Sequence, residues 1–212
     1  MKKIIPALFL LLCFTSCDLS KYQLVNDYDF ETVFEKSKGT ETATYDQVME
    51  YYDNLAKAYT SIKMVEYGKT DSGLPLHLAI YSPTEEFDFD KLRKNNVIVL
   101  INNGIHPGES DGIDATMMLF RDLAQDSIPI PKNTIIATIP VYNIGGALNR
   151  NSHTRTNQNG PKEYGFRGNA RNYDLDRDFI KADTRNTRSF AEIFHDVKPD
   201  LFIDTHVSDG AD

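Results

Sequence analysis

A histidine and a glutamate stand three residues apart near the middle of the chain, at His106 and Glu109, with a Pro-Gly pair between them. The Pro-Gly pair predicts a turn, so the two side chains can converge instead of diverging as they would on an extended strand. Imidazole nitrogen and carboxylate oxygen both suit zinc, and a catalytic zinc site takes three protein ligands and leaves a fourth position for water. The pair therefore predicts two ligands of a metal site, and the third must come from elsewhere.

The same two residues also have a plainer interpretation, because a short pattern of this kind recurs by chance as a surface histidine beside a solvated glutamate. The neighbouring segments favour the metal site. Residues 97–101 form a continuously apolar, β-branched run that predicts a central strand covered on both faces. Residues 113–124 place apolar side chains on one face of a predicted helix, and ligands lie at such strand ends in open α/β sheets.

A third ligand is expected at the end of another strand. Residues 134–142 predict a second buried strand, and residues 200–206 predict a third buried strand that ends on His206. Parallel strands deliver their carboxyl ends to the same edge of a sheet. The imidazole of His206 is therefore expected to meet the side chains of His106 and Glu109 at one ion.

The remaining segments complete an α/β pattern. Residues 44–59 predict a helix that begins with a capping box, and residues 64–70 and 74–81 predict the two strands of a hairpin. Residues 184–197 predict a further helix whose inward face includes Phe190, Ile193 and Phe194. Between these elements, residues 147–172 form a long polar loop, and a loop of this kind inside a compact domain is more often functional than idle.

Three blocks of residues carry a family resemblance. They are His106-Pro-Gly-Glu109, Asp174-Leu-Asp-Arg177-Asp-Phe and Asp204-Thr-His206. In this order and context they resemble the zinc carboxypeptidase family of the carboxypeptidase A type, over roughly residues 44–212. The resemblance implies an α/β/α sandwich with a mixed, largely parallel sheet. It also implies a zinc ion bound by His106, Glu109 and His206.

The second block carries over further roles by resemblance. Asp174 fits the carboxylate that orients the first histidine ligand, and Arg177 fits the arginine that grips the terminal carboxylate of the substrate. The family usually has Asn where this chain has Asp176. An anion there would repel a free carboxylate and could bind Arg177 itself, which places exopeptidase specificity in question. The alternative is a surface network of Asp and Arg side chains.

The resemblance also implies an arginine that polarises the scissile carbonyl and a later glutamate that acts as general base. We assign the arginine to Arg155, with Arg150 as the competitor, since the spacing does not decide between them. The sequence printed here stops at Asp212, before the position of the base. We therefore expect a catalytic domain that lacks its C-terminal part and is inactive alone, and we favour a fragment over a truncated copy. Glu163 or Asp209 could substitute as base.

The N-terminus predicts export. Residues 1–16 combine two lysines, an apolar run and a small-residue end, which predicts a signal peptide, and Cys17 is the expected lipid acceptor of a bacterial lipoprotein. An ordinary secretory peptide or an uncleaved anchor is the alternative. Residues 17–43 would then be a lipid-anchored spacer before the catalytic domain at residues 44–212. This predicts a protein anchored to a membrane of the cell envelope, on the periplasmic or the outer-surface side.

Cysteine content and charge limit the possible partners. The two cysteines, Cys13 and Cys17, both lie in this N-terminal region, so the mature domain has none for a disulfide or a thiolate metal site. The full chain carries a net charge of −8, and removing residues 1–16 takes away two lysines and no acid, which leaves −10. Nucleic acid requires basic patches, so we expect no nucleic-acid partner.

The expected function is that of a zinc metallopeptidase of the cell envelope, which hydrolyses peptides or the peptide stems of peptidoglycan with a metal-activated water. Two alternatives stay open. One is a zinc amidohydrolase that deacylates small acylated amino acids. The other is a catalytically silent, metal-binding envelope lipoprotein, which the missing base suggests.

Overall fold

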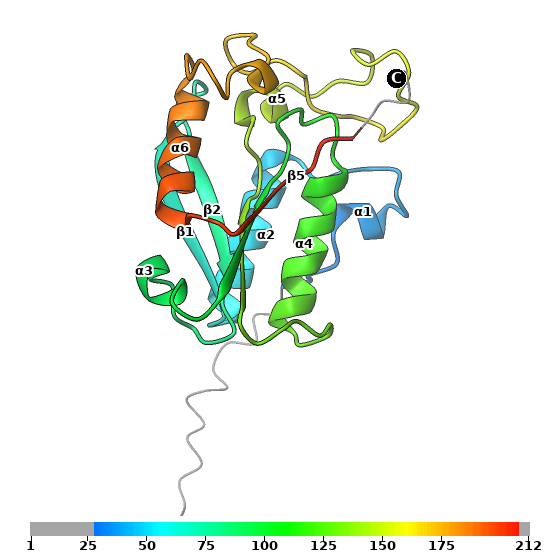
Figure 1. Cartoon of the computed structure of the whole chain (residues 1–212). Coiled ribbons are helices and arrows are strands. Elements are labelled where there is room, and N and C mark those ends of the chain that lie inside the picture. Colours follow the sequence, from blue (N-terminus) through cyan, green and yellow to red (C-terminus); the bar gives the residue numbers. More distant parts are fainter. Residues whose placement is uncertain (1–27, 208–212) are drawn as a thin grey trace, which may run out of the picture.

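The computed structural model describes residues 28–207, and in it a five-stranded sheet separates two layers of helices (Figure 1). The strands lie in the order β1-β2-β4-β3-β5. The pairs β3–β4 and β3–β5 are parallel, whereas β1–β2 and β2–β4 are antiparallel. The mixed sheet with helices on both faces confirms the predicted α/β/α fold class.

The five strands and the helices α2, α4 and α6 agree with the predicted segments to within a few residues, whereas the short helices α1, α3 and α5 and a 3₁₀ helix were not predicted. The strands are β1 (Ile62–Lys69), β2 (Pro75–Tyr81), β3 (Val97–Asn102), β4 (Thr134–Ile139) and β5 (Leu201–Asp204). The helices are α1 (Val33–Lys36), α2 (Tyr45–Ala58), α3 (Phe89–Leu92), α4 (Asp111–Ala124), α5 (Ile144–Leu148) and α6 (Arg185–Val197), together with a short 3₁₀ helix at Leu175–Arg177. The predicted capping box of α2 is present, because Thr44 and Gln47 bond to each other's backbone N–H groups.

Each face of the sheet has its own apolar core. Helices α2 and α4 cover one face, where Leu55 and Phe120 are fully buried. Helices α3 and α6 cover the other face, where Ile193 is fully buried. Strand β3 supplies both cores, since Leu100 belongs to one and Ile101 to the other. This two-sided burial explains why β3 is continuously apolar, and it fixes the strand whose end carries His106 and Glu109.

Strand β5 differs from the expectation of a third buried strand. Among the described strands it pairs only with β3, so it lies at the edge of the sheet. The side chains of Leu201 and Ile203 are 52% and 40% exposed, although their types match those of the buried strands. Phe194 on α6, which we expected to point inward, is 37% exposed and packs against Phe202 at this edge.

The segment before residue 44 also differs from the expected spacer, because its described part packs on the domain. Phe30 and Thr32 are buried, and Glu35 in α1 pairs with Arg121 of α4 at 2.7 Å. The expected signal peptide at residues 1–16 and the lipid acceptor Cys17 lie outside the described residues. Within residues 28–207, every helix is too short or too polar to cross a membrane.

Candidate metal centre

The carboxyl ends of β3 and β5 bring the three predicted ligands together. Because these strands are parallel neighbours with Asn102 opposite Asp204, the residues that follow them emerge at the same edge of the sheet. After β3 the chain makes a turn in which the backbone N–H of Glu109 donates to the carbonyl of His106 at 2.9 Å. His206 follows β5 by two residues. His206, about 100 residues further along the chain, thus meets His106 and Glu109 at the edge of the sheet that the strand pattern predicted.

The ligand atoms of His106, Glu109 and His206 all lie within 4.8 Å of one another. Nδ1 of His106 is 3.1 Å from Oε1 of Glu109, and the ring centroids of His106 and His206 are 5.0 Å apart. Zinc bonds of about 2.0–2.2 Å at tetrahedral angles separate two ligand atoms by about 3.3–3.6 Å, so the distance between Nδ1 of His106 and Oε1 of Glu109 is already close to that of a zinc site. Two imidazoles and one carboxylate are also a donor set that zinc accepts. The residues present therefore fit the ion.

Asp174 fixes the orientation of the first imidazole. Its Oδ1 lies 3.0 Å from Nε2 of His106, which leaves Nδ1 directed at Glu109. Oδ2 of Asp174 accepts from Nε and Nη2 of Arg167, both at 3.1 Å. Burial opposes ionisation of Asp174, but the hydrogen bonds from His106 and Arg167 outweigh it and lower the pKa of this carboxyl. The predicted orienting residue is thus in contact with the imidazole it was expected to orient.

Glu109 is held as an anion. Oε1 accepts from Nη2 of Arg155 at 2.7 Å, and Oε2 accepts from the backbone N–H of Val207 at 3.2 Å. Burial alone would raise the pKa of Glu109, but the hydrogen bonds from His106, Arg155 and Val207 dominate and bring it to about 2. A carboxylate that stays ionised near neutral pH is the form that binds a metal ion.

His206 is less buried than His106 and lies between two carboxylates. Its Nδ1 is 2.9 Å from Oδ2 of Asp204, and its Nε2 is 3.8 Å from Oδ1 of Asp176. Burial raises the pKa of Asp204, and the nearby His206 and a hydrogen bond from Asn102 only partly offset that effect. The contact with Asp204 restricts the rotation of the His206 ring.

A cavity of about 560 Å³ opens above these ligands, and we refer to it as the metal cavity. Its walls include the three ligands and the predicted residues Arg155, Asp176 and Arg177. Arg177 pairs with the adjacent Asp176 at 3.0 Å, as the substitution of the usual Asn had suggested. The charge of Arg177, the residue expected to grip a substrate carboxylate, is thus partly neutralised by its neighbour.

The structure separates the two candidates for the carbonyl-polarising arginine. Arg155 lines the metal cavity beside Glu109, whereas Arg150 donates to the backbone carbonyls of Thr42, Ala43 and Glu163. Arg150 therefore stabilises the fold. Glu163 lines a different cavity, and Asp209 lies outside the described residues.

Gly108 allows Arg155 to lie against the ligand turn. A Cβ atom at this position would come within 2.6 Å of Nε of Arg155 and 2.9 Å of the carbonyl oxygen of Gly165. Both contacts are closer than real Cβ atoms allow. The glycine of the His-Pro-Gly-Glu turn thus admits the guanidinium to Glu109.

Sequence reasoning missed two residues of the site. Arg167 lines the metal cavity, holds Asp174 and places Nη1 4.0 Å from Glu109. It lies in the polar loop at residues 147–172, where other arginines are equally plausible and no periodicity distinguishes one from another. Asp204 was part of the third block but had no role assigned. Its position two residues before His206 was the available signal.

Comparison with known proteins agrees with this geometry. The sequence model described as zinc carboxypeptidase matches residues 48–206. No curated protein sequence matches the chain.

Several solved structures share the fold. A metallo-carboxypeptidase from Burkholderia cenocepacia is 20% identical with a TM-score of 0.61, and the match covers 79% of this chain and 42% of that one. A metallo-carboxypeptidase from Pseudomonas aeruginosa is 15% identical with a TM-score of 0.59, covering 79% and 40%. Bovine thrombin-activatable fibrinolysis inhibitor is 13% identical with a TM-score of 0.53, covering 78% and 60%. At these identities the likeness shows the fold alone, and this chain spans about two fifths of the two bacterial structures.

Proposed function

The chain belongs to the zinc carboxypeptidase family, and from this membership we propose that it forms the zinc-binding part of a metallopeptidase that hydrolyses peptide bonds. The observation that supports this most directly is the convergence of His106, Glu109 and His206 within 4.8 Å at the carboxyl edge of the sheet. Because the chain spans only part of the length of the structures it matches, the activity is proposed for the whole protein.

The zinc ion would be held by His106, Glu109 and His206. When bound there, it would supply a Lewis acid and lower the pKa of a coordinated water to about 7. The contribution of Asp174 is to accept the Nε2 proton of His106, which fixes the tautomer and directs Nδ1 to the ion. The contribution of Arg155 and Arg167 is a pair of cations in the wall of the metal cavity.

These two arginines are suited to stabilising the charge that develops on a carbonyl oxygen during hydrolysis. Fixed cations in a partly buried site stabilise such a charge more than they do in water. Arg155 is the better placed, because its side chain is only 11% exposed and already contacts a ligand. Arg167, at 47% exposed, has greater freedom to follow the substrate.

The ion pair between Asp176 and Arg177 affects which peptide bond the site is expected to cleave. A guanidinium that already binds a carboxylate at 3.0 Å offers less attraction to the free C-terminal carboxylate of a peptide. We therefore propose that removal of a single C-terminal residue is not the preferred reaction of this site. Cleavage of an internal bond, or of a substrate whose terminus is not a free α-carboxylate, fits this pair better.

The proposal extends to the environment of the protein. The N-terminal pattern of charge, apolar run and Cys17 favours a lipoprotein of the cell envelope, where peptides and peptidoglycan stems are the available substrates. Mass spectrometry of the membrane fraction would detect a lipid on Cys17, and a Cys17→Ser variant recovered unmodified in the soluble fraction would support the anchor. Equal membrane association of both proteins would exclude it.

The experiment that tests the function combines metal content with turnover. We expect purified protein to bind one zinc ion per chain, and a His206→Ala variant to lose it while a His195→Ala variant keeps it. Peptide cleavage by the protein that contains the whole catalytic domain should stop when a chelator is added and return with zinc. Turnover that survives complete metal removal would refute the proposal.

The two alternative functions give different results in the same experiment. Release of acyl groups from small acylated amino acids without peptide cleavage would indicate an amidohydrolase. Zinc binding with no hydrolysis of either substrate class by that protein would indicate a silent metal-binding lipoprotein.

A further inference from the structure

His206, the third ligand, follows the least supported strand of the described sheet. Strand β5 has four residues, pairs only with β3 among residues 28–207, and exposes the side chains of Leu201 and Ile203. A short edge strand with few buried contacts opens easily on its own. The position of His206 must therefore be set by contacts between its chain neighbours and the buried part of the fold.

Two consecutive asparagines at the end of β3 make such contacts. Successive side chains of a strand point to opposite faces of the sheet, so Asn102 and Asn103 reach β5 from different sides. Nδ2 of Asn102 donates to Oδ1 of Asp204 at 3.2 Å, and Oδ1 of Asn103 accepts from Oγ1 of Thr205 at 3.0 Å. Each of the two residues before His206 is thus held by a fully buried side chain.

The side-chain amide of Asn103 has one favourable orientation. Its Nδ2 lies 2.9 Å from Oγ1 of Thr116 on α4 and 2.8 Å from Oγ1 of Thr138 on β4. Both hydroxyl protons are already used, because each threonine donates to a backbone carbonyl, at 2.8 Å and 3.1 Å respectively. The two hydroxyls must therefore accept from Nδ2, which leaves Oδ1 of Asn103 facing Thr205.

Thr205 connects this buried network to the segment that carries the ligand. Its Oγ1 donates to Oδ1 of Asn103 at 3.0 Å and to the carbonyl of Asn102 at 3.1 Å, and its backbone N–H donates to the same carbonyl at 3.1 Å. Within residues 28–207, Thr205 is the donor to Oδ1 of Asn103. A side chain without a hydroxyl at position 205 would leave this buried oxygen unpaired, which is unfavourable.

Gly112 gives independent support for the close packing of Thr205. It lies in the first turn of α4, where alanine would form the helix more readily. A Cβ atom at position 112 would overlap Oγ1 and Cβ of Thr205 and would come within 2.9 Å of Oδ1 of Asn103. The glycine thus leaves the space in which the hydroxyl of Thr205 meets the amide of Asn103.

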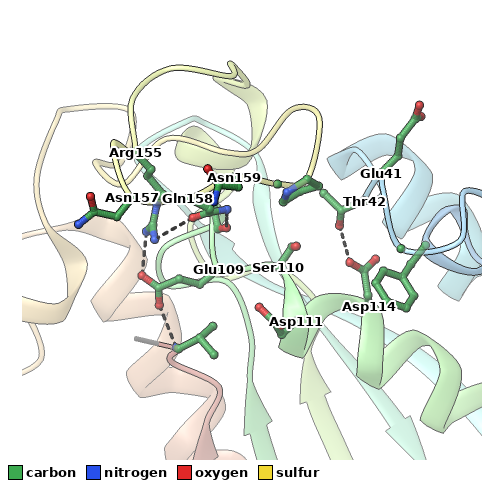
Figure 2. A pocket seen from close by; sticks show the side chains of 16 residues that line it. Glu41, Thr42, Glu109, Ser110, Asp111, Asp114, Arg155, Asn157, Gln158 and Asn159 are labelled. Carbon is green, nitrogen blue, oxygen red and sulfur yellow. Dashed lines mark hydrogen bonds and ion pairs between the residues drawn. The ribbon is translucent and has the colours of Figure 1, made fainter. Parts of the chain in front are cut away.

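On the other side of His206 the chain is held by a ligand. The backbone N–H of Val207 donates to Oε2 of Glu109 at 3.2 Å, and Figure 2 shows the side chains of Glu109 and Arg155 directed towards each other. Because Glu109 belongs to the group that could hold the metal, the contact with Val207 lies within the ligand set. The contact of Thr205 is the one that joins this segment to the packed interior.

We propose that Thr205 is a positioning residue for the third ligand: its hydroxyl ties the end of β5 to Asn103 and so holds the imidazole of His206 at the distance that the other two ligands require. The inference rests on the proposed function for its consequence, because a fixed imidazole matters only where a metal binds. Zinc affinity would then depend on a hydroxyl that does not itself contact the ion.

The test compares Thr205→Val, which keeps the shape of the side chain and loses the hydroxyl, with Thr205→Ser, which keeps the hydroxyl. In the protein that contains the whole catalytic domain, we expect Thr205→Val to lower zinc affinity about 10-fold or more in a competition titration, and Thr205→Ser to stay close to wild type. The visible absorption spectrum of bound Co²⁺, which reports ligand geometry, should change in Thr205→Val and be restored in Thr205→Ser.

A measurement on metal-free protein separates this inference from the proposed function. NMR relaxation should show greater picosecond-to-nanosecond motion of the His206 ring in Thr205→Val than in wild type, whether or not zinc binds. Ser82→Ala is the matched control, because it removes another fully buried hydroxyl, 3.2 Å from that of Thr84. Ser82 follows β2, which is antiparallel to β4, so it lies at the end of the sheet opposite the ligands.

Urea titrations would establish that each variant is folded, and Thr205→Ala takes the place of Thr205→Val if that variant does not fold. Unchanged zinc affinity with an unchanged Co²⁺ spectrum in Thr205→Val would overturn the inference. Equal weakening by Ser82→Ala, or a Thr205→Ser protein as impaired as Thr205→Val, would overturn it too. A wild-type protein that binds no zinc would refute the proposed function, and equal motion of the His206 ring in wild type and Thr205→Val would refute the positioning role.

Discussion

Replacing Asp174 by alanine should weaken zinc binding without unfolding the protein. Asp174 accepts the Nε2 proton of His106 at 3.0 Å and is itself held by two contacts from Arg167 at 3.1 Å. Its side chain is 31% exposed, so its removal leaves no large cavity in either core. The lost interactions are those that orient one ligand and increase its basicity.

The size of the effect follows from the role of such partners. Removing a carboxylate that holds a metal-binding imidazole lowers metal affinity by roughly 10–100-fold, which corresponds to about 1.4–2.7 kcal/mol. Asp174→Asn keeps an oxygen that can accept from Nε2 but loses the charge, so its effect should lie between those of wild type and Asp174→Ala. Zinc affinity should therefore decrease in the order wild type, Asp174→Asn, Asp174→Ala.

The assay is a competition titration in which a fluorescent chelator and the protein compete for zinc at neutral pH. Asp183→Asn serves as the control, because Asp183 is 61% exposed and, among residues 28–207, its side chain pairs only with Lys181, at 3.6 Å and away from the ligands. Thermal melts of the metal-free proteins would show whether folding is preserved. If Asp174→Ala bound zinc as tightly as wild type while remaining folded, the assigned role of this carboxylate would be refuted.

Further substitutions test the roles of the two arginines, of the buried Asp114 and of the core residue Phe120. Arg155→Ala should lower kcat about 100-fold or more in a protein that contains the whole catalytic domain. Arg150→Ala should leave kcat unchanged but lower the free energy of unfolding by about 1–3 kcal/mol, because buried backbone carbonyls lose their donor. Steady-state kinetics and urea titrations of both variants distinguish the two effects. Burial raises the pKa of Asp114 from 3.8 to about 6. The protonated carboxyl therefore contributes up to about 3 kcal/mol to stability below pH ~4, and this contribution is lost as the pH rises through about 6. Urea titrations from pH 4 to 7 should show this loss in the wild type relative to Asp114→Asn, and stability curves of the two proteins that stay parallel would contradict it. Phe120→Ala should cost about 3–5 kcal/mol in the same assay, since the ring is fully buried between α4 and the sheet, and a loss under 1 kcal/mol would contradict the assigned packing.

The metal ligands could be predicted from the sequence because their positions depend on regular elements. An apolar run of the length of β3 specifies a buried strand, and parallel strands have their carboxyl ends at one edge. His106 and Glu109 lie in the short turn after β3, and His206 lies just after β5, so their meeting could be predicted without knowledge of the long loops.

The rest of the site depends on the loop between α5 and α6, where sequence reasoning had no periodicity to use. Arg150, Arg155 and Arg167 lie in the same polar segment, and tertiary contacts alone separate the one that holds backbone carbonyls from the two that line the metal cavity. The exposure of β5 could not be predicted from the sequence either. Leu201, Phe202 and Ile203 have the composition of a central strand, and nothing in that composition says whether a second neighbour covers it.

Anomalous diffraction at the zinc edge, from crystals grown with zinc, tests most directly whether His106, Glu109 and His206 bind one zinc ion. We expect a single strong peak at about 2.0–2.2 Å from a nitrogen of each histidine and an oxygen of Glu109. A peak coordinated by other side chains, or full zinc exposure with no peak between these three residues, would contradict it.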